Sequence, residues 1–370
     1  MCDLNLALAT DPGNNAECTH FIISMLVGLI AAASAHSNLI WPKPRNAIDT
    51  FLPEWSGGKA PTTWEDGENP CACINGTGQA CDIGQTCLWF SVGCGIGCPE
   101  CDGLNANPNG KDRCNNGMKP TINNPLHRTY NRAAKAGSDA DWTKHNPWRA
   151  PGTAPVYDPC GMAAGAPHPT AGHGEYTTTK FAQVGDRGSA LPKMPSGVVW
   201  RAGDVVETAW SIRANHGGGW QYRLCPAASN LTEACFQSTP IPFAANSDLL
   251  LANGTRFTLS DAQSTFVSDG TLPVGSTWQM NPLPNTRDFP GGHFPGLNGY
   301  QFPPPCHETA LPVGLGHGIC SGEWITNITL YDRLRVPSHL PAGEYVLGYR
   351  MDCEASAQVW SSCADITITG

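Results

Sequence analysis

Positive charge is scarce in this sequence. Only 14% of the 370 residues are charged, and 22 Lys and Arg residues stand against 31 Asp and Glu residues, which gives a net charge of −9. Three of the acids and none of the basic residues lie in residues 1–35, so the chain from His36 onward carries −6. A protein that binds nucleic acid needs a basic surface, and we therefore exclude nucleic acid as a partner. A neutral polysaccharide is indifferent to this charge.

Long hydrophobic runs are also missing. The mostly apolar segment from Phe21 to Ala33 is too short to cross a bilayer, and Ala33 and Ala35 are small residues of the kind found at signal-peptidase sites. We predict that residues 1–35 are a signal peptide, that the protein is secreted, and that no membrane segment remains after cleavage. The stretch before Phe21 contains acids and no basic residue, which leaves the true start codon open. Cleavage after Ala35 makes His36 the first residue.

Cysteine, in contrast, is abundant. Of the 17 cysteines, Cys2 and Cys18 lie in the predicted leader, and in an exported chain the density of the other 15 indicates disulfides rather than metal ligands. An odd number leaves one thiol free, bonded to another molecule, or paired in a way that the sequence does not reveal. Short loops suggest the pairs Cys225–Cys235, Cys306–Cys320 and Cys353–Cys363. Secretion also fits the four Asn-x-Ser/Thr glycosylation sequons, which are Asn75, Asn230, Asn253 and Asn327.

A cysteine-rich insertion spans about residues 71–114. It holds eight cysteines among many Gly and Asn residues, so it has too little apolar area to fold without cross-links, and Cys160 could close this cluster. Trp89 and Phe90 within it have two interpretations: they stack on sugar rings, or they form a miniature core of the insertion.

The pattern of strands defines the fold class. Long amphipathic helices, internal repeats, coiled-coil heptads and phosphate-binding loops are absent, whereas β-branched and aromatic residues alternate with polar ones from about residue 175 onward. About seven strands predict an all-β, immunoglobulin- or fibronectin III-like sandwich with long loops. We expect residues 36–370 to form one domain. The segments that carry a strand pattern cover residues 175–180, 198–200, 204–212, 220–225, 256–259, 264–267, 324–330, 343–351, 358–360 and 363–368.

The mature N-terminus offers unusual chemistry. The prolines after His36 favour an extended segment that can lie flat on the surface. A first-residue histidine can chelate one metal through its α-amine and its imidazole, and His216, at the end of a predicted strand and before three glycines, offers a third nitrogen. Planar coordination by three nitrogens favours Cu(II), so we predict copper as the cofactor.

Several motifs, taken together and in order, resemble the lytic polysaccharide monooxygenases. The resemblance covers the mature N-terminus and roughly residues 175–370, and it is strongest to the branch from arthropods and other non-fungal eukaryotes, which is active on cellulose and chitin. The motifs are His36-Ser37-x-Leu-x-x-Pro-x-x-Arg45-Asn46, Ala214-Asn215-His216-x-Gly, Leu224-Cys225-Pro226, Thr232-x-x-Cys235-Phe236 and Cys363-Ala364-Asp365-Ile366.

This resemblance implies a copper enzyme that cleaves glycosidic bonds oxidatively. Its histidine brace would consist of the amine and imidazole of His36 and the imidazole of His216. Trp360 occupies the position where relatives place an axial Tyr or Phe, and this departure puts reactivity in doubt, because tryptophan can wall off a metal but is a poor ligand for it. Gln358, on the same face of the same strand, would hydrogen-bond an oxygen species at the metal, or it would simply be a polar surface residue.

The remaining expectations concern the substrate and the alternatives. Trp41, Trp220 and Tyr222 flank the expected copper site and could stack on sugar, although burial in the core is an equal alternative for each of them. The implied partners are an insoluble β-linked polysaccharide and an external electron donor with O2 or H2O2, and we expect a monomer. The alternative function is that of a secreted copper- or carbohydrate-binding cell-wall protein without turnover.

Overall fold

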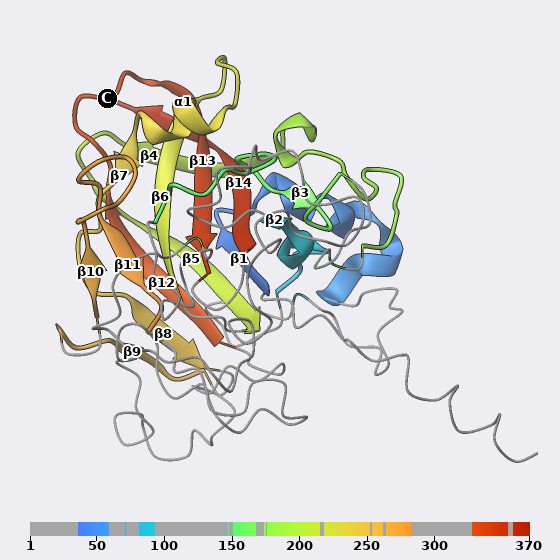
Figure 1. Ribbon diagram of the computed structural model, residues 1–370, viewed down its shortest axis with the longest axis horizontal. Helices are drawn as coiled ribbons and strands as arrows, with labels where there is room; N and C mark the ends of the chain where they lie inside the picture. The colour runs from blue at the N-terminus through green and yellow to red at the C-terminus, as the bar shows by residue number, and fades with distance from the viewer. Residues whose placement is uncertain are drawn as a thin grey trace, which may run out of the picture. The chain divides into compact units, whose positions relative to one another are not determined.

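Two β-sheets pack face to face and form a sandwich (Figure 1). The structure, a computed structural model, describes residues 36–58, 71, 81–92, 147, 151–167, 174, 176–214, 218–251, 254–261, 264–282, 328–353 and 358–370. The two mainly antiparallel sheets confirm the predicted all-β, immunoglobulin-like sandwich. In the part of the chain that is described, no helix is long and apolar enough to cross a membrane.

The first sheet has five antiparallel strands. Among the described strands, its first strand pairs with one neighbour, the second. In spatial order the strands are β1 (His36–Trp41), β5 (Val205–Ala214), β12 (Ile328–Arg335), β8 (Asp248–Leu251) and β9 (Arg256–Thr258).

The second sheet has nine strands. Its main path runs through β10 (Phe266–Val267), β11 (Trp278–Met280), β6 (Gly219–Pro226), β13 (Gly343–Asp352), β14 (Gln358–Thr369), β2 (Trp89–Val92) and β3 (Met162–Ala163). Two further strands lie beside this path: β4 (Pro195–Arg201) pairs in parallel with β14, and β7 (Pro240–Ile241) pairs with β6. Helical turns are α1 (Glu233–Gln237) and the 3-10 helices η1 (Arg45–Phe51), η2 (Pro53–Gly58), η3 (Thr86–Leu88) and η8 (Gly188–Ala190).

Aromatic side chains from both sheets fill the space between them. The ring of Trp210 on β5 contacts Trp220 on β6 and Tyr349 on β13, with centroid distances of 4.5 and 5.8 Å. All three side chains are fully buried. Large apolar surfaces removed from water in this way supply the main favourable free energy of folding.

The N-terminal segment is extended, as predicted, but it does not lie on the surface. Ser37, Asn38 and Leu39 are buried, because β1 pairs with β5 on one side and packs against β13 and β14 of the other sheet. The expectation of a surface-lying terminus was therefore wrong. The irregular loop expected after it is also more ordered than the sequence indicated, since η1 and η2 occupy residues 45–58.

Most of the predicted strands that fall in the described ranges are present, but residues 176–180 form no strand. Their backbone groups are used by side chains instead. The amide of Thr177 donates to the side-chain oxygen of Gln85, and the Gln85 amide donates to the Thr177 carbonyl, both at 2.8 Å. The predicted segments 358–360 and 363–368 join into the single strand β14.

Three disulfides lie among the described residues: Cys71–Cys87, Cys160–Cys363 and Cys225–Cys235. The predicted pair Cys225–Cys235 is confirmed. The predicted pair Cys353–Cys363 is wrong, and Cys160 does not close the cysteine-rich cluster, because Cys160 and Cys363 are bonded to each other across the fold. The predicted pair Cys306–Cys320 lies outside the described residues.

Trp89 and Phe90 belong to the core. Both are fully buried on β2, which extends the second sheet beyond β14. Phe90 stacks on Trp360 at a centroid distance of 4.2 Å, so it packs into the sandwich rather than into a separate core of the insertion. Neither side chain is accessible to a sugar ring.

Candidate functional site

The strand pairing brings the two predicted copper-binding regions together. The Cα of His36, at the start of β1, is paired with that of Ala214, at the end of β5. The ladder shifts between His36 and Ser37, so that Ser37 pairs with Ile212. His36, the first residue of the predicted mature chain, therefore lies beside the end of β5. Ala214, which ends β5, precedes His216 by two residues in the sequence.

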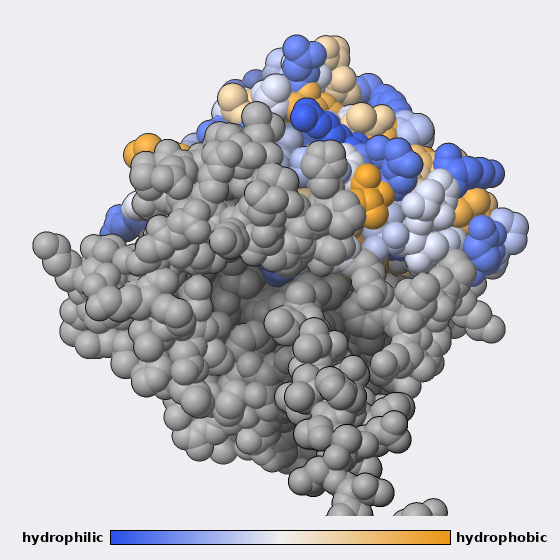
Figure 2. All heavy atoms as spheres, turned by 45° about the vertical axis from the view of Figure 1, so that its right-hand side comes forward, coloured by the Kyte–Doolittle hydropathy of each residue, from blue (hydrophilic) through white to orange (hydrophobic). Residues whose placement is uncertain are grey.

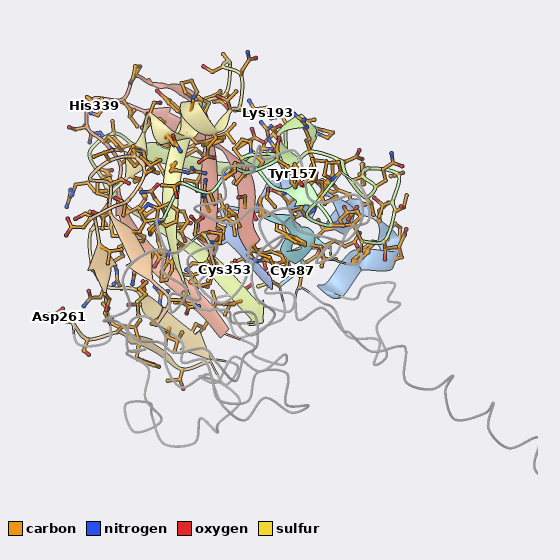
Figure 3. All side chains as sticks on the ribbon, in the orientation of Figure 1. Cys87, Tyr157, Lys193, Asp261, His339 and Cys353 are labelled. Carbon is orange, nitrogen blue, oxygen red and sulfur yellow. A yellow bond between two sulfur atoms is a disulfide. The ribbon has the colours of Figure 1, made fainter. Side chains whose placement is uncertain are left out.

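His216 itself lies outside the described residues, but both flanks of its segment are fixed. Ala214 ends β5 in the first sheet, and Gly218 leads into β6 in the second. Gly218 has a φ of +90°, and a Cβ atom there would lie 1.9 Å from the carbonyl oxygen of Asp352. Only glycine allows this approach to the end of β13, which Cys353 marks in Figure 3.

Two buried hydrogen bonds fix the residues that follow His36. The hydroxyl of Tyr349 on β13 donates to Oγ of Ser37 at 3.2 Å, and the hydroxyl of Ser211 on β5 donates to Oδ1 of Asn38 at 3.3 Å. The first bond crosses between the sheets, and the second joins neighbouring strands of one sheet. The start of β1 is therefore held from two directions.

Gln358 and Trp360 lie on β14, which packs against β1. Gln358 is only 4% exposed, so it is not a polar surface residue. Trp360 is fully buried and its ring stacks on Phe90. Both residues are thus held in the interior, on a strand that contacts β1.

The three candidates for sugar stacking have different positions. Trp220 and Tyr222 are fully buried and donate hydrogen bonds to Oδ2 of Asp332 at 2.7 and 2.8 Å, so burial is the correct alternative for both. Trp41 is 46% exposed, but it ends β1, and five residue steps along the strand place it about 17 Å from His36. Trp41 therefore does not flank His36.

Exposed hydrophobic residues in the described part of the chain are scattered. In the view of Figure 2 they are interspersed with hydrophilic ones on the coloured surface. Isolated residues of this kind are normal for a soluble surface and mark no docking patch. They are Trp41, Phe51, Val199, Val205, Phe266 and Val274.

Other motif residues serve the scaffold. The guanidinium of Arg45 donates two hydrogen bonds, of 2.7 and 2.6 Å, to the carboxylate of Asp365, and both side chains are buried. The side chain of Asn46 donates to the carbonyl of Cys160 at 2.9 Å and accepts from the amide of Cys363 at 3.0 Å. These contacts tie the segment after β1 to β14 and to the disulfide beside it.

The carboxyl groups of Asp332 and Glu233 have strongly shifted pKa values, in opposite directions. Burial raises the pKa of Asp332 to about 6, against the hydrogen bonds from Ser247, Tyr222 and Trp220, which lower it. For Glu233, burial alone would raise the pKa, but Arg223 and Arg350 hold it at about 2. Asp332 is sealed in the core and Glu233 stays ionised near neutral pH, so neither can exchange protons with a substrate as an acid catalyst.

The donor chemistry fits copper. An amine and two imidazoles form a nitrogen set that favours Cu(II). The backbone of His36 pairs with Ala214, the last residue of β5, and the chain continues from there to His216. Among the residues that the structure describes, no group of three or more His, Cys, Asp or Glu side chains could hold a metal ion elsewhere.

Comparisons with known proteins identify similar solved structures. No family model and no curated protein matches the chain. It is similar to the AA15 lytic polysaccharide monooxygenase from Thermobia domestica, with 16% identity over 46% of this chain and 62% of that chain and a TM-score of 0.22. It is also similar to an AA10 lytic polysaccharide monooxygenase from Streptomyces lividans, with 14% identity, 49% and 61% coverage and a TM-score of 0.21. A chitin-binding domain from Burkholderia pseudomallei shares 9% identity over 90% of this chain and 100% of that one, with a TM-score of 0.31.

These similarities are distant. The chain spans less than two thirds of the two monooxygenase chains.

Sequence reasoning missed Tyr349 and Ser37 as neighbours at this site. The alternation of β13 is a signal for an inward-facing Tyr349, because Tyr345, Leu347 and Met351 share its period. Nothing in the local sequence connects it with Ser37, since the contact joins strands of different sheets.

Proposed function

We propose that this protein is a secreted, copper-dependent enzyme that oxidatively cleaves glycosidic bonds in an insoluble β-linked polysaccharide of the cellulose or chitin type. The observation that carries the proposal is the pairing of His36 with Ala214. Ala214 precedes His216 by two residues in the sequence, and two residues of chain span at most about 7 Å. We also propose the arthropod and non-fungal eukaryote branch of the lytic polysaccharide monooxygenases, because the motifs of this chain resemble that branch most strongly.

The proposed ligands are the α-amine and imidazole of His36 and the imidazole of His216. Copper held there would supply one-electron chemistry with O2 or H2O2, which the acids and bases of the chain do not provide. All three nitrogens bind metal only when they are unprotonated. Copper uptake is therefore expected to weaken as the pH falls through the range in which imidazole takes up a proton.

Two residues of β14 are assigned supporting roles. Trp360 would wall off one side of the site, where the resemblance implies Tyr or Phe in relatives, and it is held in place by its stack on Phe90. Gln358, two residues earlier on the same face, would offer a hydrogen bond toward the site. We propose no metal-binding role for either residue.

Mass spectrometry of soluble products tests the proposed activity. The mature protein with copper, a reductant and O2 or H2O2 is expected to release oxidised oligosaccharides from cellulose or chitin. His216→Ala should abolish release, whereas His339→Ala, which changes an exposed histidine outside the site (labelled in Figure 3), should not. Oxidised products at an equal rate from the His216→Ala variant would contradict the proposed ligand set.

A specific observation favours a second candidate function. Trp360 stands where the resemblance implies an axial Tyr or Phe, and it is buried among apolar residues. A copper- or carbohydrate-binding cell-wall protein without turnover fits this departure. Normal copper binding with no oxidised product on any β-linked glycan would favour this second function.

Secretion implies further properties that belong to the same proposal. We propose that the protein acts outside the cell as a monomer, with an external electron donor and without a nucleic acid or membrane partner. Of the four sequon asparagines, Asn230 is the one within the described residues, and it is exposed just before α1. A mass decrease of the secreted protein on treatment with an N-glycosidase, absent in Asn230→Gln, would identify Asn230 as glycosylated.

A further inference from the structure

Within the described ranges, β1 pairs with a single strand of its own sheet, β5. The ladder is also irregular between His36 and Ser37, so Ser37 is the residue at which regular pairing begins. Contacts that fix the position of Ser37 therefore also fix the backbone to which His36 is attached.

Tyr349 supplies a contact to Ser37 from the opposite sheet. Its hydroxyl lies 3.2 Å from Oγ of Ser37 and 3.5 Å from Sδ of Met351. Tyr349 is fully buried and Ser37 is 1% exposed, so water does not compete for this hydrogen bond. The contact is specific because both partners lie in a dry core.

The ring of Tyr349 is itself held firmly. It contacts Trp210 at a centroid distance of 5.8 Å and Tyr222 at 5.6 Å. Burial raises the pKa of Tyr349 well above its usual value, so its hydroxyl keeps its proton over the working pH range. A rigid and permanently protonated donor is suited to fixing the position of another residue.

A second contact fixes Asn38 to the strand that leads to His216. The Ser211 hydroxyl donates to Oδ1 of Asn38 at 3.3 Å, and the Cα atoms of these two residues are paired. The two residues after His36 are thus held to β13 and to β5. Together these bonds form a clamp on the start of β1.

We propose that Tyr349 is a positioning residue for the N-terminal metal chelate, acting through its hydrogen bond to Ser37. This inference rests on the proposed function and deepens it, because the arrangement of the amine and imidazole of His36 depends on where residue 37 is held. Nothing in this role requires Tyr349 to touch the metal or the substrate.

Removal of one hydroxyl group tests the proposal. Tyr349→Phe keeps the ring and loses the hydrogen bond, and we expect its affinity for Cu(II) to fall about fivefold in a competition titration. The electron paramagnetic resonance spectrum of bound Cu(II) should broaden or shift, because the chelate adopts more than one arrangement. Ser37→Ala should have the same effects, and the double variant should be no worse than either single variant.

Tyr345→Phe is the matched control. Tyr345 lies on the same strand and the same inward face, is also buried, and donates to the carbonyl of Pro341 at 3.1 Å. Its replacement should lower thermal stability by a similar amount and leave the copper affinity and the spectrum unchanged.

The possible results separate the inference from the function on which it rests. If the unaltered mature protein binds no copper, the proposed function fails and this inference fails with it. If the unaltered protein binds copper while Tyr349→Phe matches Tyr345→Phe in affinity and spectrum, Tyr349 is purely structural and the inference alone is overturned.

Discussion

At the scale of single residues, the motifs that support the resemblance divide into chemistry and scaffold. Arg45 and Asp365 bind each other, and Asn46 binds the backbone of Cys160 and Cys363 at their disulfide. They hold the segment after β1 against β14 and offer nothing to a metal. The sequence could suggest these residues only as members of a pattern, because their contacts join positions far apart in the chain.

The buried pair Arg45–Asp365 predicts a large loss of stability on neutralisation. Asp365→Asn leaves the Arg45 guanidinium buried without its counter-charge, and we expect a loss of about 3–5 kcal/mol in the free energy of unfolding. Denaturant unfolding monitored by tryptophan fluorescence measures it. Lys193→Met is the control, because the Lys193–Glu344 pair is about half-exposed on both sides and water screens it, so its loss should leave stability nearly unchanged. Equal losses in the two variants would contradict the assignment.

Asp332 predicts a pH dependence of stability. Its folded-state pKa of about 6 lies above the value of 3.8 expected for the unfolded chain, because burial penalises the carboxylate. Between these two values the folded state binds more protons than the unfolded state, so this group makes the protein less stable as the pH rises from about 4 to 6. The shift corresponds to about 3 kcal/mol.

Asp332→Asn should remove this contribution. Unfolding free energies of both proteins at several pH values between 4 and 7 give a difference curve. Burial also raises the pKa values of Asp49 and Asp158, but both residues are present in each protein and cancel. A difference curve that is flat over this range would show that the pKa of Asp332 is not raised.

At the scale of elements, alternation predicted the strands that have one face in the core, such as β5, β6 and β13. Alternation wrongly predicted a strand at residues 176–180, where the Gln85 side chain forms hydrogen bonds with the backbone of Thr177. Alternation also did not predict the burial of β1. Nothing within residues 36–41 shows that this strand pairs with β5 in one sheet and packs against β13 and β14 of the other. Loop length gave the correct disulfide for Cys225 but the wrong one for Cys363, whose partner is distant in sequence.

A long-range and a short-range disulfide should contribute unequally to stability. Cys160–Cys363 spans 203 residues and Cys225–Cys235 spans 10. Since a longer closed loop restricts the unfolded chain more, we expect losses of about 5 and about 3 kcal/mol when each pair is replaced by alanines. Thermal unfolding of the two double variants measures this, and a larger loss for the Cys225–Cys235 variant would contradict the loop-length argument.

At the scale of the whole molecule, the candidate site depends on the pairing of the start of β1 with the end of β5, which lie far apart in the sequence. The sequence predicted its chemistry, because a histidine released by a peptidase is a chelate whatever the fold. It could not predict that β1 pairs with β5, which brings His36 to the end of the strand before His216. It placed Trp41, Trp220 and Tyr222 around the metal, whereas two of them are core residues and Trp41 lies at the far end of β1.

The central claim is that the free amine of His36 and the imidazole of His216 bind one copper ion. Its most direct test is a Cu(II) titration of the protein that begins at His36 and of the same protein retaining Ala35, with both N-termini established by sequencing. We predict that the extra residue weakens binding at least about tenfold, because an amide nitrogen replaces the amine. Equal affinities in the two proteins would contradict the account.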